Sequence, residues 1–127
     1  MERGLPPERE RDYILSVETA EEAVAEGRLA LARQLIGQLE QDFPHLAIGG
    51  ILRCELGLLG GHLGAAQATC AAAVKLQEDA APAHLLSALV DGRLGRCRQA
   101  TAEARRALAL DPALAGALQP LQARCLF

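Results

Sequence analysis

The sequence has very few aromatic residues. It contains no tryptophan, and its tyrosine and two phenylalanines are Tyr13, Phe43 and Phe127. Valine, isoleucine and threonine are also scarce, so the residue types that favour β-strands are nearly missing. This scarcity argues against a sheet. The hydrophobic fraction of 50% is mostly alanine and leucine, which predicts an all-α protein.

The sequence also lacks a strong charge of one sign and any long apolar run. A net charge of −3 argues against a general nucleic-acid binder, and the apolar content argues against disorder. No stretch is long enough to insert into a membrane, and the first 12 residues lack the apolar core of a signal peptide. We therefore expect one soluble cytoplasmic domain, and the Ala-, Leu-, Gly- and Arg-rich composition suggests a bacterial source.

The four cysteines, Cys54, Cys70, Cys97 and Cys125, are spaced too widely for a CxxC motif. In a secreted chain they could form a disulfide framework. Without an export signal, reduced thiols are the better expectation, and most of them should be small buried hydrophobes. Cys97 lies between two arginines and is the candidate for a reactive thiol.

Three glycines mark an internal repeat of 34 residues. Gly27, Gly61 and Gly95 are each followed two positions later by leucine or cysteine and five positions later by alanine. A proline closes the first and third copies, at Pro44 and Pro112. The spacing predicts a pair of antiparallel helices per copy, with a tight turn at the glycine and an apolar stripe beginning after it.

This period, the Gly–x–Leu–x–x–Ala pattern and the closing Asp111-Pro112 resemble the tetratricopeptide repeat (TPR). The resemblance implies an all-α superhelix of helical hairpins, seven helices in all. The expected boundaries are a polar N-terminal arm over 1–12, repeats over 13–46, 47–80 and 81–114, and a C-terminal capping helix over 115–127. The large aromatics that the family places in its first helices are missing, and Gly49, Gly50 and Gly57 should make 47–60 the least stable segment.

No arrangement of residues points to catalysis. The glycine-rich run 60–64 has neither phosphate-loop nor dinucleotide spacing, and it follows a predicted helix. The three histidines lie in different repeats, which predicts no metal site, and no cofactor motif or catalytic set is visible. We expect a protein that is not an enzyme.

The resemblance implies that the first helix of each pair lines a concave groove that binds a protein partner. Read by repeat position, the groove is mostly aliphatic, with two acidic points and one arginine. It lacks the Lys, Asn and Arg pattern of the carboxylate-clamping TPR proteins. The candidate groove residues are Val17, Glu21, Val24, Ile48, Ile51, Leu52, Glu55, Leu58, Leu59, Leu85, Leu86, Leu89 and Arg93.

These residues predict an adaptor that binds an apolar or amphipathic segment of a partner protein, with self-association as a further possibility. One alternative is a dedicated chaperone of a bacterial secretion or assembly subunit, and another is a thiol- or metal-dependent enzyme or regulator. Charge changes along the chain, from −4 over 13–46 to +2 over 81–114. Such a gradient is typical of solvated helix faces, or it could orient a partner.

Overall fold

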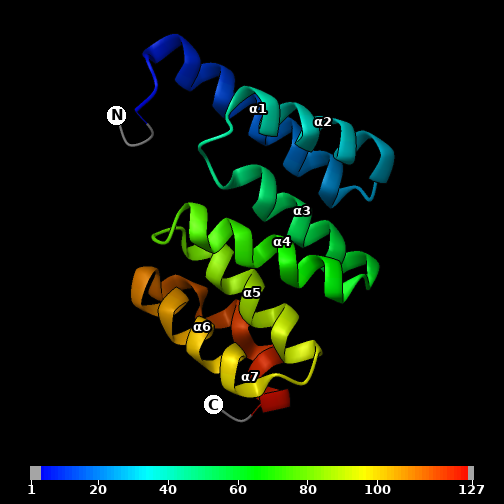
Figure 1. Ribbon diagram of the computed structural model, residues 1–127, viewed down its shortest axis with the longest axis vertical. Coiled ribbons are helices and arrows are strands. Elements are labelled where there is room, and N and C mark those ends of the chain that lie inside the picture. The colour runs from blue at the N-terminus through cyan, green and yellow to red at the C-terminus, as the bar shows by residue number, and fades with distance from the viewer. Residues whose placement is uncertain (1–3, 126–127) are drawn as a thin grey trace.

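The computed structural model describes residues 4–125 and shows an elongated stack of helices (Figure 1). No strand is present within that range, so the predicted all-α class is confirmed. Seven α-helices and one 3-10 helix follow one another: α1 (Pro7–Ala25), α2 (Leu29–Asp42), α3 (Ile48–Gly60), α4 (Leu63–Leu76), α5 (Ala81–Arg93), α6 (Cys97–Leu110), η1 (Pro112–Leu118) and α7 (Gln119–Cys125).

The turns within the three helix pairs form at the predicted glycines. Gly27, Gly61 and Gly95 have φ angles of 71°, 77° and 80°, in the left-handed region that side chains with a Cβ disfavour. In each turn the residue after the glycine donates its N–H to a carbonyl in the last turn of the preceding helix. The bond from Arg96 to Asp91, 2.8 Å long, is one of the three. The glycines therefore end α1, α3 and α5 as helix C-caps do.

Helix α1 begins earlier than the sequence predicted. Pro6 precedes a first turn that contains Pro7 and two glutamates, a combination that favours a helix start. The Arg9 guanidinium lies 4.6 Å from the centroid of the Phe43 ring and donates to the Asp42 carbonyl oxygen at 3.0 Å, which holds this turn against the end of α2. The polar arm expected over 1–12 is therefore wrong for residues 7–12, and residues 1–3 lie outside the described range.

The C-terminal tail, predicted as a capping helix over 115–127, begins with a tighter helix. The Asp111 carboxylate accepts the Ala113 N–H at 3.1 Å and starts η1, and the chain becomes α-helical at Gln119. Leu118 and Leu121 are buried against α5 and α6, so the tail covers the last helix pair. The last two residues of the predicted cap lie outside the described range.

The core relies on small residues where the helices cross. Ala32, Ala66 and Ala100 follow the three turn glycines and are all buried, as the repeat predicted. Beside Ala66, helix α3 carries Gly57, and a Cβ at Gly57 would lie 2.7 Å from the Ala66 Cβ. Where Gly57 meets Ala66, helices α3 and α4 are therefore closer than two residues with Cβ atoms would allow. This close approach fills the space that a large aromatic side chain would otherwise occupy.

His84 occupies one of the positions where TPR proteins carry a large aromatic residue. Its side chain is buried, with Nδ1 2.6 Å from Glu103 Oε2 and Nε2 2.7 Å from the carbonyl oxygen of Glu78. Because that carbonyl can only accept, Nε2 carries a proton. The histidine thus joins α5 to α6 and to the loop before α5.

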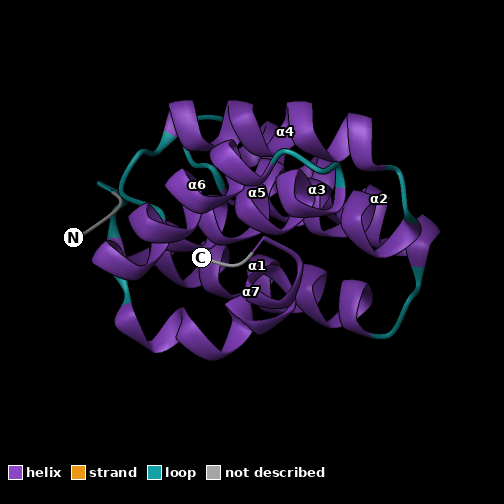
Figure 2. Cartoon of the chain, turned by 90° about the horizontal axis from the view of Figure 1, so that it is seen from below, coloured by secondary structure: helices purple, strands orange, loops and turns teal. Residues whose placement is uncertain are grey.

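The helix contacts give the stack an inner and an outer face. Each odd-numbered helix contacts the next odd one, whereas no even helix contacts another even helix within residues 4–125. The odd row is therefore the shorter, inner side of a curved stack. A view along the stack shows its two ends, α1 and α7, toward one side and α4 toward the other (Figure 2). A partner that meets the concave side meets α1, α3, α5 and α7.

Candidate binding groove

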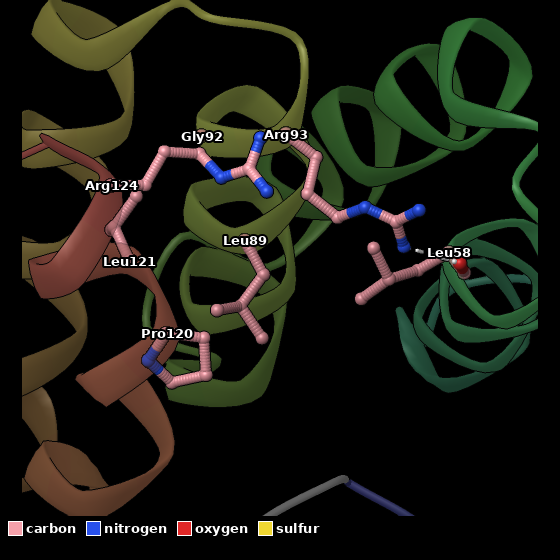
Figure 3. A pocket seen from close by; sticks show the side chains of 7 residues that line it. All are labelled: Leu58, Leu89, Gly92, Arg93, Pro120, Leu121 and Arg124. Carbon is pink, nitrogen blue, oxygen red and sulfur yellow. Dashed lines mark hydrogen bonds between the residues drawn. The ribbon is translucent and has the colours of Figure 1, made fainter.

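A pocket opens on the inner face between α3, α5 and α7 (Figure 3). Its volume is about 240 Å³, and most of its floor and walls are aliphatic side chains. Two arginines stand at its rim, one at the end of α5 and one in α7. The lining residues are Leu58, Leu89, Gly92, Arg93, Pro120, Leu121 and Arg124.

The two arginines leave positive charge at the rim of the pocket. Arg93 reaches from α5 to α3, where Nη1 donates to the carbonyl oxygen of Leu58 at 3.0 Å. Figure 3 shows the Arg124 guanidinium extending from α7 toward the Arg93 side of the pocket. Both residues are exposed, and within residues 4–125 neither forms an ion pair with a carboxylate. Their N–H donors are available to an anionic group.

Gly92 brings α7 against α5 at the back of this pocket. A Cβ at this position would collide with Leu121 Cδ1, so the leucine occupies the space that glycine leaves open. Leu121 is buried there, with Pro120 before it and Arg124 after it along α7. The wall of the pocket therefore depends on one close helix approach.

The other half of the inner face is acidic. Glu55 of α3 is half-buried, and this burial raises the pKa of its carboxyl group, to which the neighbouring charge of Glu21 on α1 adds. Neither glutamate forms an ion pair within the described residues. A carboxylate that is partly buried beside another negative charge is stabilised by a cationic group placed next to it.

Four of the predicted groove residues belong to the core. Val24 and Leu52 lie in the cluster between α1, α2 and α3, and Ile51 and Leu86 lie in the cluster around α4. All four are less than a tenth exposed. Val24, Leu52 and Leu86 therefore belong to the core and not to an open groove. Ile51 is buried too, but together with Ile48 it lines a second hollow between α1, α3 and the start of α5.

The remaining predicted residues are half-buried or exposed, and the pocket unites only Leu58, Leu89 and Arg93. Leu85 packs against the cluster that contains Leu118, and Leu59 is 65% exposed outside the pocket. The others, spread over α1 and α3, are Val17, Glu21, Ile48 and Glu55.

Three pocket residues were missed because the groove positions were read from the three repeats and not from the capping helix. Pro120, Leu121 and Arg124 come from the tail, whose 3-10 turn shifts the register of the helix that follows. The sequence did contain one signal for the packed face of the tail. Leu118 and Leu121 are the only two large aliphatic residues in 115–125, and they are spaced i, i+3 as on one face of a helix.

The cysteines are paired, which overturns the expectation of reduced thiols. Cys54 of α3 is bonded to Cys70 of α4, and Cys97 of α6 to Cys125 of α7. The first pair joins repeat positions that face each other across a helix hairpin. The repeat alignment therefore indicated that Cys54 and Cys70 lie close together, although the spacings between the cysteines did not. With all four sulfurs bonded, Cys97 is not a reactive thiol, and the cytoplasmic location, which rested partly on reduced thiols, stays an untested prediction.

Within residues 4–125, no three histidine, cysteine or acidic side chains gather as potential metal ligands. In the same range, none of the helices combines the length and the apolarity needed to cross a bilayer.

Comparison with known proteins identifies the fold. No family model matches the sequence, and no curated protein matches it significantly. Among solved structures, the TPR domain of Arabidopsis OM64 superposes with a TM-score of 0.76, at 19% identity, over 90% of this chain and 93% of that one. At this identity the similarity is one of fold, and it agrees with the helix pairs and glycine turns described above. The chain therefore has the TPR fold.

Proposed function

We propose that this protein is a non-catalytic adaptor whose inner face binds an apolar or amphipathic segment of a partner protein. The pocket between α3, α5 and α7 carries this proposal. It presents aliphatic side chains below two guanidinium groups that have no carboxylate partner in the described chain.

The pocket has the composition of a site that buries apolar groups. Leu58 and Leu89 are half-buried, so part of their surface still faces solvent, and Leu59 adds an exposed aliphatic side chain on the same helix as Leu58. Covering such surface is worth roughly 25 cal/mol per Å². A helix that inserts one or two leucines here would gain affinity from the pocket and solubility from its opposite face.

A capped, uncharged, alanine-rich helical peptide that carries two leucines three residues apart tests the proposal. Fluorescence anisotropy would measure its binding to the wild-type protein and to Pro120→Glu. This substitution puts a charge on the pocket wall at an exposed position in the first turn of α7, where an acidic residue suits the helix. We expect the substitution to weaken binding at least tenfold.

The matched control is Leu76→Glu, which also introduces a glutamate at an exposed site, but near the end of α4 on an even-numbered helix. It should leave peptide affinity unchanged. Failure of the peptide to bind the wild-type protein, or equal weakening by the two substitutions, would refute the groove as the binding surface.

A further inference from the structure

The unpaired charges of the inner face are sorted by sign. Glu21 and Glu55 lie on α1 and α3, whereas Arg93 and Arg124 lie on α5 and α7. The other close charge pairs described, Arg53 with Glu40 and His84 with Glu103, join an odd helix to an even one and are satisfied internally.

The four inner charges lie in the C-terminal halves of helices that run in the same direction. Arg93 and Arg124 lie at the ends of α5 and α7, about one helical turn further along than Glu21 and Glu55 on α1 and α3. Leu58 and Leu89 lie in the same part of α3 and α5, between the acidic pair and the basic pair. The inner face therefore carries a band that changes from acidic through aliphatic to basic as it crosses from α1 to α7.

We propose, building on the groove function above, that this band selects a dipolar amphipathic helix. A basic side chain of the partner helix lies against Glu21 and Glu55, its apolar side chains cover Leu58 and Leu89, and an acidic side chain lies against Arg93 and Arg124. The ligand is thus defined by opposite charges at the two ends of one apolar face.

The dimensions of the fold set the spacing of those charges. Packed helices lie about 8–10 Å apart, and the acidic and basic pairs are two helix spacings apart, about 16–20 Å. At a rise of about 1.5 Å per residue, a helix covers this distance in about eleven to thirteen residues. Residues i and i+11 also lie on one face, because eleven residues complete about three turns, and leucines at i+4 and i+7 would lie between them.

Burial of Glu55 supports a basic group at the acidic end. The pKa of its carboxyl is raised because burial removes part of its hydration and because Glu21 adds a negative charge nearby. A lysine or arginine of the partner would supply the missing charge. The bidentate N–H donors of the two arginines at the other end suit a carboxylate in the same way.

Four capped, alanine-rich peptides test the proposal. All carry leucines at i+4 and i+7, and they differ only at i and i+11, which are Lys and Glu, Lys and Lys, Glu and Glu, or Gln and Gln. Wild-type protein should bind the Lys–Glu peptide at least about threefold more tightly than any other, as expected for exposed charge pairs at low salt.

Two double variants reverse one end of the band each. Arg93→Glu with Arg124→Glu makes the band wholly acidic and should shift the preference to the Lys–Lys peptide. Glu21→Lys with Glu55→Lys makes it wholly basic and should shift the preference to Glu–Glu. Circular dichroism and thermal melting first establish that each variant is folded, and because either reversal alone is sufficient, failure of one variant to fold leaves the test intact.

A matched control separates local charge from net charge. Arg105→Glu with Arg106→Glu changes the net charge as much as the arginine reversal does, but on exposed residues of α6, an even-numbered helix. It should keep the wild-type ranking of the four peptides. An unchanged ranking in the folded inner-face variants, or the same shift in the α6 control, overturns the proposal.

The Gln–Gln peptide distinguishes this proposal from the function on which it rests. If that peptide binds and Pro120→Glu weakens its binding, the groove is the binding surface whatever the charged peptides show. If all four peptides then bind equally, only the dipolar selection is wrong.

Discussion

Two helical glycines should respond in opposite directions to replacement by alanine. Gly37 lies inside α2, and a Cβ added there would meet no atom within 4 Å. Gly57 lies inside α3, where the same Cβ would be 2.7 Å from the Ala66 Cβ, 3.3 Å from its Cα and 3.4 Å from the carbonyl oxygen of His62. The gain in helix propensity is the same at both sites, so their difference isolates the close approach of α3 and α4.

The expected magnitudes follow from these distances. Gly37→Ala should stabilise the protein by about 0.5–1 kcal/mol, because alanine loses less backbone entropy in a helix and meets no obstacle. At Gly57 the same gain is opposed by overlap with the Cβ and backbone of Ala66, which cannot rotate away. Overpacking of this kind costs about 1–3 kcal/mol. Gly57→Ala should therefore be less stable than Gly37→Ala by about 1–3 kcal/mol.

Urea unfolding, followed by circular dichroism at 222 nm (the usual helix wavelength), measures this difference. With an m-value of about 1–3 kcal/mol/M, the two midpoints should differ by roughly 1 M, with unchanged slopes. If Gly57→Ala is stabilised as much as Gly37→Ala, helices α3 and α4 are not in close contact at this point, and a glycine is not needed where they cross.

Three more predictions concern buried polar groups and the disulfides. Glu55→Gln and Asp91→Asn should each stabilise the protein at neutral pH, because burial is the main reason that the pKa values of both carboxyl groups are raised. A raised carboxyl pKa means that each native acid lowers the free energy of unfolding as pH rises. In urea unfolding at several pH values, the gain should vanish below the ordinary carboxyl pKa of about 4. His84→Ala should lower the free energy of unfolding by about 2–4 kcal/mol, because it removes two hydrogen bonds and leaves a cavity. Calorimetry would measure this loss, and a loss under about 1 kcal/mol would mean that the two buried hydrogen bonds of His84 contribute little. A dithiol reductant should open the half-buried Cys97–Cys125 bond before the fully buried bond between α3 and α4. Thiol alkylation and mass spectrometry would measure the order of opening, and simultaneous opening of both bonds would contradict the prediction.

The turns could be predicted from the sequence because a positive φ leaves glycine almost no substitute. Gly27, Gly61 and Gly95 set the repeat frame, and the helices that follow from the frame are those of the structure. The start of α1 was missed because its polar first turn carries no apolar periodicity. There, a proline, the acidic residues and the contact of Arg9 with Phe43 determine helix formation.

The distribution of the predicted groove residues between pocket and core has a related reason. Repeat position separates odd from even helices, but it does not separate the concave stripe of an odd helix from the stripe that packs on its partner. Leu58, Leu89 and Arg93 therefore fell in the pocket, whereas Leu52 and Leu86 fell in the core. The prediction that 47–60 is the least stable segment remains to be tested by hydrogen exchange.

The positions of the two disulfides have a mechanical consequence. When force is applied at the two ends of the chain, it passes through the two disulfides and not through the backbone that they enclose. The enclosed segments are Cys54 to Cys70 and Cys97 to Cys125, with sequence separations of 16 and 28. Those segments cannot lengthen, so within residues 4–125 α1 and α2 are the only helix pair able to extend fully, and the rest of the stack lengthens only outside the two bridged segments. Reduction would release roughly 3.3–3.6 Å of contour length for each enclosed residue. An oxidised molecule of this kind behaves as a short tether, extensible in its N-terminal third and between the two bridges, and fixed in length across the two segments that the bridges enclose.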